Sequence, residues 1–171
     1  MISLVRASEI CDNKLLTLET DFQARAREWL HKMHEISVYP LIYCGFRSCT
    51  EQDALYAQGR TKSGRIVTKA RGGQSYHNYG LAFDWVALRE NPKNKGFYES
   101  DWDNDGAYRI GDAIGHALKI TPIEWESGHL QDARYKKFSD IPAKGTTRAV
   151  QAFVENIEPK KPSFFSSWKS R

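Results

Sequence analysis

The residues with the clearest chemical potential lie in the segment SYHNYGLAFDW, residues 75–85. His77 and Asp84 stand seven positions apart, and Asp84 sits inside an apolar run that has the composition of a buried strand. Because an unpaired buried carboxylate is costly, Asp84 needs a salt bridge, a hydrogen-bond network or a metal ion to compensate its charge. The segment therefore brings together two potential metal ligands.

A metal site built on His77 and Asp84 requires the chain to reverse direction between them. Seven fully extended residues would span roughly 23–25 Å, whereas the ligand atoms of one zinc ion lie about 2 Å from it. Residues 78–80, Asn-Tyr-Gly, have the composition of a turn. In the strand that follows, alternation of side chains places Asp84 on the opposite face from Phe83.

A second segment, WESGHLQ at residues 125–131, supplies what such a site still lacks. His129 is the best candidate for a third ligand, since two histidines, one carboxylate and a water make an open catalytic zinc site. Glu126 could take a proton from water and deliver it to a leaving amine. Spacing alone leaves an alternative open, in which the histidine caps a turn and the aspartate is held by hydrogen bonds.

The elements that must position these residues are predicted to be mixed. Helical periodicity covers residues 17–36 and 104–119, and Thr50 can cap a short helix that runs to 58. β-Branched and aromatic runs predict strands at 38–44, 65–68, 81–88 and 121–125. No regular strand–helix–strand repeat is present, so an α+β fold with an antiparallel sheet is favoured. A further short helix is predicted at 148–157.

Composition predicts one soluble globular domain. The 171 residues are 40% hydrophobic and 27% charged, which suffices for a single core. No apolar run reaches the length of a membrane span, so we expect no stable membrane insertion. The N-terminal segment lacks the features of a secretory signal, so we expect the chain to be made in a cytoplasm. The three cysteines form no CxxC pair, which predicts free thiols in a reducing compartment. A net charge of +4 suits a polyanionic partner, but no nucleic-acid-binding motif accompanies it, so we expect no nucleic acid.

Three segments together resemble a known family. GFRSCTEQDALYAQGRT, GGQSYHNYGLAFDW and WESGHLQ, which start at residues 45, 72 and 125, look like the zinc peptidases of the D-Ala-D-Ala carboxypeptidase and L-alanyl-D-glutamate endopeptidase family. Within it, the chain is most similar to phage endolysins and bacterial wall hydrolases of the L-alanyl-D-glutamate type. The resemblance covers most of residues 15–132, and its SxHxxGxAxD core is specific.

The resemblance implies a role for each matched residue. It implies that His77, Asp84 and His129 hold one catalytic Zn²⁺ and that Glu126 is the catalytic base. It also implies that Arg47 stabilises the oxyanion of the tetrahedral intermediate. The implied fold is a small antiparallel sheet packed with helices, as in the hedgehog and D,D-peptidase zinc proteins.

Other positions are assigned less directly. By the resemblance, Ser75 would support the site or contact substrate. Many relatives have a proline before the third ligand where this chain has Gly128, which we expect to leave the loop less constrained without removing a ligand. We predict a catalytic domain over residues 1–141 and an extension of unassigned role over 142–171.

The resemblance implies a peptidoglycan hydrolase that cuts the L-Ala–D-Glu bond of wall stem peptides, as a phage endolysin does in host lysis. We expect a monomer, made in the host cytoplasm, that reaches the wall after release, for example through a holin. Two alternatives stay open. One is a D-Ala-D-Ala carboxypeptidase of the same chemistry, and the other is a non-enzymatic zinc module like that of the hedgehog proteins. Because a binding module needs neither Glu126 nor Arg47, their presence argues against the second.

A separate acidic segment suggests a second metal. Aspartates at 101, 103, 105 and 112, with Gly106 between them, have the oxygen-ligand spacing of a calcium-binding EF-hand loop. The alternative is an acidic N-terminus of the following helix, which the helix dipole would stabilise. Ca²⁺ is therefore a second possible cofactor.

Overall fold

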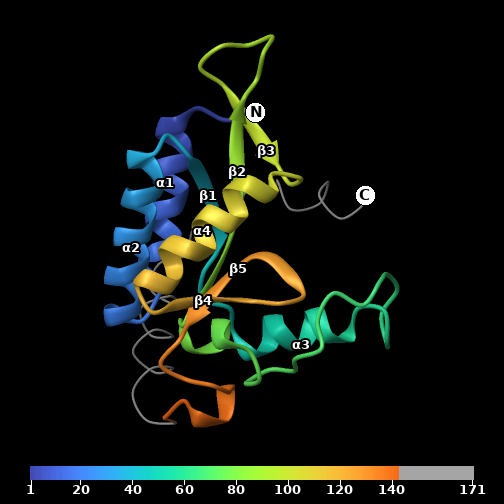
Figure 1. Cartoon of the computed structure of the whole chain (residues 1–171). Helices are drawn as coiled ribbons and strands as arrows, with labels where there is room; N and C mark the ends of the chain where they lie inside the picture. The colour runs from blue at the N-terminus through green and yellow to red at the C-terminus, as the bar shows by residue number, and fades with distance from the viewer. Residues whose placement is uncertain (143–171) are drawn as a thin grey trace.

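The computed structural model describes residues 1–142 of the chain (Figure 1). Predictions that concern later residues, including the helix at 148–157 and the extension after the catalytic domain, lie outside the described part. The longer elements are the helices α1 (Leu4–Leu15), α2 (Thr20–Glu35), α3 (Cys49–Ala57) and α4 (Asp105–Ala117), and the strands β1 (Tyr39–Cys44), β2 (Ala82–Glu90), β3 (Tyr98–Asp101), β4 (Ile120–Ile123) and β5 (Glu126–Asp132). Two short 3₁₀ helices, η1 (Tyr76–Tyr79) and η2 (Phe138–Asp140), complete the set.

The strands form a single antiparallel sheet with β2 at its centre. The order is β1-β2-β5-β4, and β3 pairs with β2. One end of β2, residues 82–84, pairs with β5, while its other end, residues 87–90, pairs with β3. Within residues 1–142, four α-helices and a small antiparallel sheet confirm the predicted α+β class. None of the helices in residues 1–142 is long and apolar enough to cross a membrane.

Aromatic packing between α2, α4 and β2 forms the centre of the core. The ring of Trp29 on α2 lies 5.2 Å from Phe83 and 5.0 Å from Trp85, both on β2. Its indole Nε1 donates a hydrogen bond to the carbonyl oxygen of Gly111 on α4. A Cβ at Gly111 would lie 2.6 Å from the Trp85 ring, so only glycine allows this approach of α4. Because Phe83 and Trp85 face the helices, alternation along β2 directs Asp84 to the opposite face.

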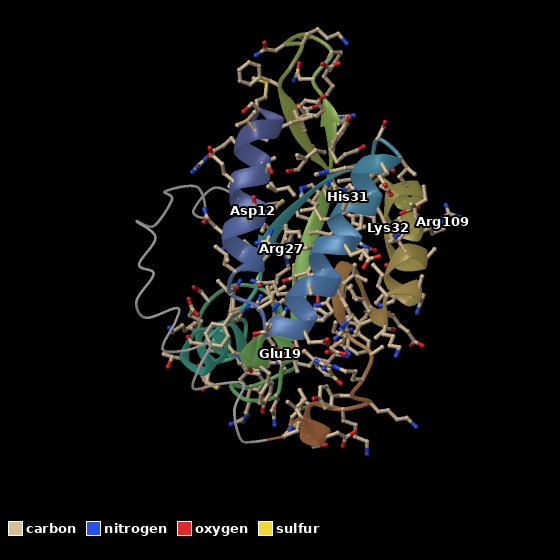
Figure 2. The ribbon with its side chains drawn as sticks, turned by 90° about the vertical axis from the view of Figure 1, so that its left-hand side faces the viewer. Asp12, Glu19, Arg27, His31, Lys32 and Arg109 are labelled. Carbon is tan, nitrogen blue, oxygen red and sulfur yellow. The ribbon has the colours of Figure 1, made fainter. Side chains whose placement is uncertain are left out.

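The helices differ from their predicted bounds chiefly at the N-terminus. The helix predicted from residue 17 begins at Thr20, and α1, which was not predicted, precedes it. Ser3 caps α1 through its side chain, and the buried residues Ala7, Cys11 and Leu15 recur every fourth position. Figure 2 shows α1 and α2 side by side. The predicted helix at 104–119 is confirmed as α4, whereas α3 is capped by Ser48 rather than by Thr50.

The predicted strand at 65–68 is wrong. These residues have no regular structure, and Ile66 and Val67 are exposed. Their backbone is held instead by side chains, since Arg60 donates to the carbonyl oxygen of Thr68. A β-branched run without a neighbouring strand has no ladder to join. The strand predicted at 121–125 ends at Ile123, and β5, which carries His129, was not predicted as a strand.

Candidate active site

Three side-chain atoms from distant parts of the chain converge at one end of β2. Nε2 of His77 lies 3.1 Å from Oδ1 of Asp84 and 3.3 Å from Nδ1 of His129. Nδ1 of His129 lies 2.9 Å from the same Asp84 oxygen. All three residues are buried. These atoms form a compact triangle, which we call the His77–Asp84–His129 triad.

The local fold explains why these residues meet. Asp84 and His129 are paired residues on the neighbouring strands β2 and β5. His77 lies on η1, which ends at Gly80 with a left-handed φ of 67°. A Cβ at Gly80 would lie 2.9 Å from the backbone nitrogen of Glu19, so the tight reversal requires glycine. The reversal predicted at 78–80 thus brings His77 back over the start of β2.

Hydrogen bonds on the outer side of each imidazole fix its orientation. Nδ1 of His77 donates to the carbonyl oxygen of Gly45 at 2.7 Å, and Nε2 of His129 donates to Oε1 of Gln131 at 3.2 Å. With those nitrogens protonated, the neutral imidazoles turn lone pairs toward Asp84. Such outer partners orient histidine ligands in metal sites.

The triad fits a zinc ion. Zinc ligands at about 2.0–2.1 Å in a tetrahedron are about 3.3 Å apart, close to the observed 2.9–3.3 Å. Burial lowers the pKa of His77, but the Asp84 carboxylate and Cys44 together outweigh it and raise the pKa to about 10. Burial raises the pKa of Asp84, but the two histidines hold it below its ordinary value. The triad therefore attracts positive charge, as a proton or as a metal ion.

A second group of potential ligands shares two members of the triad. Ligand atoms of Cys44, His77 and Asp84 lie within 4.8 Å of one another. The Cys44 sulfur, however, lies 3.8 Å from Nδ1 of His77, the nitrogen that also contacts Gly45. Asp84 and His129 face the other nitrogen, Nε2. One imidazole cannot turn both nitrogens to a single ion, so the geometry favours His129 over Cys44 as the third ligand.

Arg47 lies against the triad from the segment that precedes α3. Its Nη2 donates to the Cys44 sulfur at 3.1 Å and approaches Oδ2 of Asp84 at 3.4 Å. Its Nη1 donates to Oε1 of Gln52 at 3.0 Å. Burial lowers the pKa of Arg47, but Cys44 and Asp84 raise it above its ordinary value, so the guanidinium stays charged.

Glu126 is the first residue of β5 and is exposed to solvent, close enough to the triad to interact with its charges. Desolvation and the charge of Asp84 raise the pKa of its carboxyl, whereas His129, His77 and Arg47 lower it. The net direction is upward from the ordinary value of 4.5. A carboxylate with a raised pKa, next to a cation site, has the properties of a general base.

Residues 15–131 match the VanY family, described as D-alanyl-D-alanine carboxypeptidase. The match covers more than half of the chain and includes the whole triad, Arg47 and Glu126. The chain belongs to the VanY family. This confirms the resemblance noted in the sequence.

One curated relative is the peptidoglycan L-alanyl-D-glutamate endopeptidase CwlK of Bacillus subtilis (strain 168). It is 42% identical over 98 residues, which are 57% of this chain and 54% of CwlK. The chain thus matches about half the length of this relative.

Ser75, the remaining predicted site residue of this VanY-family chain, is the N-cap residue of η1. Its backbone nitrogen donates to Oδ1 of Asn78 at 3.2 Å, and the Asn78 amide nitrogen donates to the carbonyl oxygen of Arg47 at 2.8 Å. Ser75 therefore helps to shape the helix that carries His77, whereas a contact with substrate stays a prediction.

The expectation of a less constrained loop at Gly128 is wrong. Gly128 is buried within β5, with a φ of 81°. A Cβ at this position would lie 2.3 Å from the carbonyl oxygen of Trp85 and 3.1 Å from the ring of Tyr108. Neither an L-residue with a side chain nor a proline fits this backbone, because a proline fixes φ near −65°. Glycine here lets β5 approach β2 closely.

The acidic segment does not form an EF-hand loop. Asp101 ends β3, while the residues from Asp105 to Asp112 belong to α4. Seven residues of α-helix separate their ends by about 10 Å along the axis, so Asp112 cannot close a loop around an ion held by Asp101. Asn104 caps α4 through its side chain and also donates to Asp101. The segment is instead the N-terminus of α4, as the alternative interpretation held.

Sequence reasoning missed the residues that orient the site. Gln131 follows His129 by two positions in a strand, so alternation would have placed both on one face. The carbonyl of Gly45 carries no sequence signal, because a backbone oxygen is available at every position. Gln52 is fully buried and accepts a hydrogen bond from Arg47.

Proposed function

We propose that the chain is a zinc-dependent peptidase that hydrolyses the L-Ala–D-Glu bond of peptidoglycan stem peptides. The observation that carries this proposal is the triad, whose three ligand atoms lie within 3.3 Å of one another with both outer histidine nitrogens engaged. His77, Asp84 and His129 would hold the metal. When bound, zinc supplies Lewis-acid chemistry, polarising a carbonyl and lowering the pKa of water.

Glu126 moves the proton that hydrolysis requires. Its carboxylate accepts a proton from the attacking water as the new carbon–oxygen bond forms. It then delivers that proton to the amine nitrogen as the carbon–nitrogen bond breaks. A raised pKa suits both steps, since the group must hold the proton briefly and then release it. Its exposed position at the start of β5 leaves it open to substrate.

Arg47 stabilises the negative charge that develops on the carbonyl oxygen. Three hydrogen bonds, to Gln52, Cys44 and Asp84, hold its guanidinium beside the triad. A guanidinium has five N–H donors, so donors remain for a substrate oxygen. Donors placed in advance where charge develops are among the strongest contributions to catalysis.

The choice of bond rests on likeness and on charge. CwlK is named an L-alanyl-D-glutamate endopeptidase, and the shared region includes 98 aligned residues. The stem peptide is anionic at D-Glu, and cationic side chains lie along the segment from α3 to η1. Arg60 and Arg71 both stack on the ring of Tyr56, at 3.9 and 4.8 Å from its centroid. Cationic partners of this kind suit a substrate that carries carboxylates.

A D-Ala-D-Ala carboxypeptidase is the second candidate, because the matched family carries that description. The two activities share the triad, Glu126 and Arg47, and differ only in the amide bond that is attacked. A non-enzymatic zinc module is disfavoured, since it would need neither a raised-pKa carboxylate nor a guanidinium at the metal site.

Mass spectrometry of digested peptidoglycan with end-group labelling tests the proposal. We expect new amino groups on D-Glu, L-Ala left on muramic acid, and neither free D-alanine nor new reducing sugars. Free D-alanine would assign the carboxypeptidase instead, and new reducing ends would overturn the peptidase proposal. Glu126→Gln, in the same digestion, is the matched inactive control.

We also propose that the protein acts on the wall after leaving the cytoplasm in which it is made, for example through a holin. Expression alone should then leave host cells intact, and co-expression with a holin should lyse them. Lysis by the chain alone would contradict this route.

A further inference from the structure

Gln52 is a polar side chain that is completely buried. It lies on α3, and its exposed fraction is 0%. Its amide is fully engaged, because Nε2 donates to the carbonyl oxygen of Ala70 at 2.9 Å and to Oγ1 of Thr68 at 3.2 Å. Its Oε1 accepts from Nη1 of Arg47 at 3.0 Å. Burial of such a group is costly unless each polar atom is paired, and here each is.

The surroundings of Gln52 allow only one orientation of its amide. The Ala70 carbonyl can only accept a hydrogen bond, so it must face the NH₂ end of the Gln52 amide. Thr68 also accepts a hydrogen bond from the backbone nitrogen of Ala70. The carbonyl end of Gln52 is therefore fixed toward Arg47. The irregular segment around 68–70, which forms no strand, serves to orient this amide.

Arg47 is fixed at its backbone and at its guanidinium, and the two terminal guanidinium nitrogens face partners of different charge. Its backbone nitrogen donates to the carbonyl oxygen of His77 at 3.0 Å, which fixes the start of the side chain. At the far end, Nη2 faces the Asp84 carboxylate, while Nη1 faces the neutral oxygen of Gln52. A second carboxylate at that place would neutralise the guanidinium. A neutral acceptor orients the group and leaves its charge available.

We propose that Gln52 is a positioning residue for Arg47, holding the guanidinium in the orientation from which it donates to the developing oxyanion. The inference rests on the proposed function, because it assigns a partner to the oxyanion-stabilising residue. It predicts that substitutions at Gln52 lower kcat, and that they do so only when Arg47 is present.

A double-mutant cycle tests this dependence. Gln52→Leu should lower kcat by about tenfold to a hundredfold with little change in KM, as expected when a catalytic group is misplaced by about 1 Å. In an Arg47→Ala background the same change should lower kcat by less than about twofold, because the group it positions is gone. Gln23→Leu is the matched control, since the side-chain amide of Gln23 donates to the carbonyl oxygen of Leu15 and not to a residue of the site. It should leave kcat unchanged.

Thr68→Val provides a second variant should Gln52→Leu fail to fold. It retains the shape of the side chain and removes the hydroxyl that accepts from Gln52. We expect a smaller loss of kcat, about severalfold, that also disappears in the Arg47→Ala background. Urea unfolding of the metal-free variants gives a cycle independent of activity, and the changes at 47 and 52 should be non-additive there too.

Two results would overturn the inference. One is an equal loss of kcat from the Gln52 change with and without Arg47, which would indicate a general structural role. The other is unchanged kcat in both Gln52→Leu and Thr68→Val. Both results can be obtained only with an active wild-type protein. They are therefore distinct from failure of the proposed function, in which the wild-type protein exposes no new amino group on D-Glu.

Discussion

Replacing Gly128 by alanine should weaken both the fold and the metal site. Gly128 has a φ of 81°, and an added Cβ would lie 2.3 Å from the carbonyl oxygen of Trp85. That oxygen belongs to the central strand β2, so it cannot move without disturbing the sheet. The strand β5 must therefore shift by about 1 Å to restore an ordinary contact distance. His129, the next residue, would move with it.

Two costs determine the size of the effect. Left-handed backbone costs an alanine about 1–2 kcal/mol, and overpacking against a fixed neighbour costs about 1–3 kcal/mol. The reduced entropy of the unfolded chain returns about 0.4–1 kcal/mol. We therefore expect a loss of about 1–4.5 kcal/mol in the free energy of unfolding. Displacement of Nδ1 of His129 should also lower zinc affinity by at least about tenfold.

Urea unfolding of the metal-free protein and a zinc competition titration measure the two effects. Gly96→Ala is the matched control, because Gly96 has a φ of 80° and a Cβ added there would meet nothing within 4 Å. It carries the backbone cost without the contact, and it lies in the loop between β2 and β3, at the other end of β2 from the triad. If Gly128→Ala and Gly96→Ala lose the same stability and bind zinc equally well, the reasoning from close packing at Gly128 is refuted.

Three further outcomes follow from the site and its surroundings. Glu126→Gln should keep its zinc and lower kcat by at least about a hundredfold. In the wild-type protein, kcat/KM should fall as the pH drops through the pKa of Glu126, which lies above 4.5, because a protonated base cannot accept a proton. Gln131→Leu should weaken zinc binding by about tenfold to a hundredfold, measured by competition with a chelator, since His129 loses its outer hydrogen bond. Asp132→Asn should cost about 1–3 kcal/mol of stability in urea unfolding, because it removes the buried carboxylate that accepts from Arg25 and Arg134, while both arginines keep their bonds to Asp21. Burial raises the pKa of Asp132, but its arginine partners hold that pKa below 3.8. The stability that the ionised Asp132 provides is therefore present above pH 3.8 and is lost as the pH falls through the lowered pKa. The asparagine variant should lack this dependence on acid.

Much of the site could be anticipated because its residues sit in short, strongly patterned segments. The turn at 78–80 and the alternation along β2 are local features, so sequence alone placed Asp84 opposite Phe83. The pairing of Asp84 with His129 is a contact between residues 45 positions apart. Spacing alone left this pairing open, although His129 was the best candidate for a third ligand, and the family resemblance implied the same ligand.

The errors have a common physical origin, since each depends on a tertiary neighbour. The run at 65–68 has strand-forming residues but no strand to pair with, and its last residue, Thr68, instead accepts a hydrogen bond from Gln52 on α3. At position 128 the sequence shows only a glycine, whereas the structure shows that the Trp85 carbonyl oxygen leaves no room for a side chain there. The acidic segment matched a ligand spacing, but Asn104 caps a helix there. Hydrogen-bond partners decide each case.

The central claim is that one zinc ion, held by His77, Asp84 and His129, enables hydrolysis of the stem peptide. The most direct test is to prepare metal-free protein and titrate zinc while measuring release of D-Glu amino groups from peptidoglycan. Activity should rise linearly and level off at one equivalent, and His129→Ala should neither bind that equivalent tightly nor recover activity. Full activity in the metal-free protein, or recovery of the His129→Ala protein at one equivalent, would contradict the account.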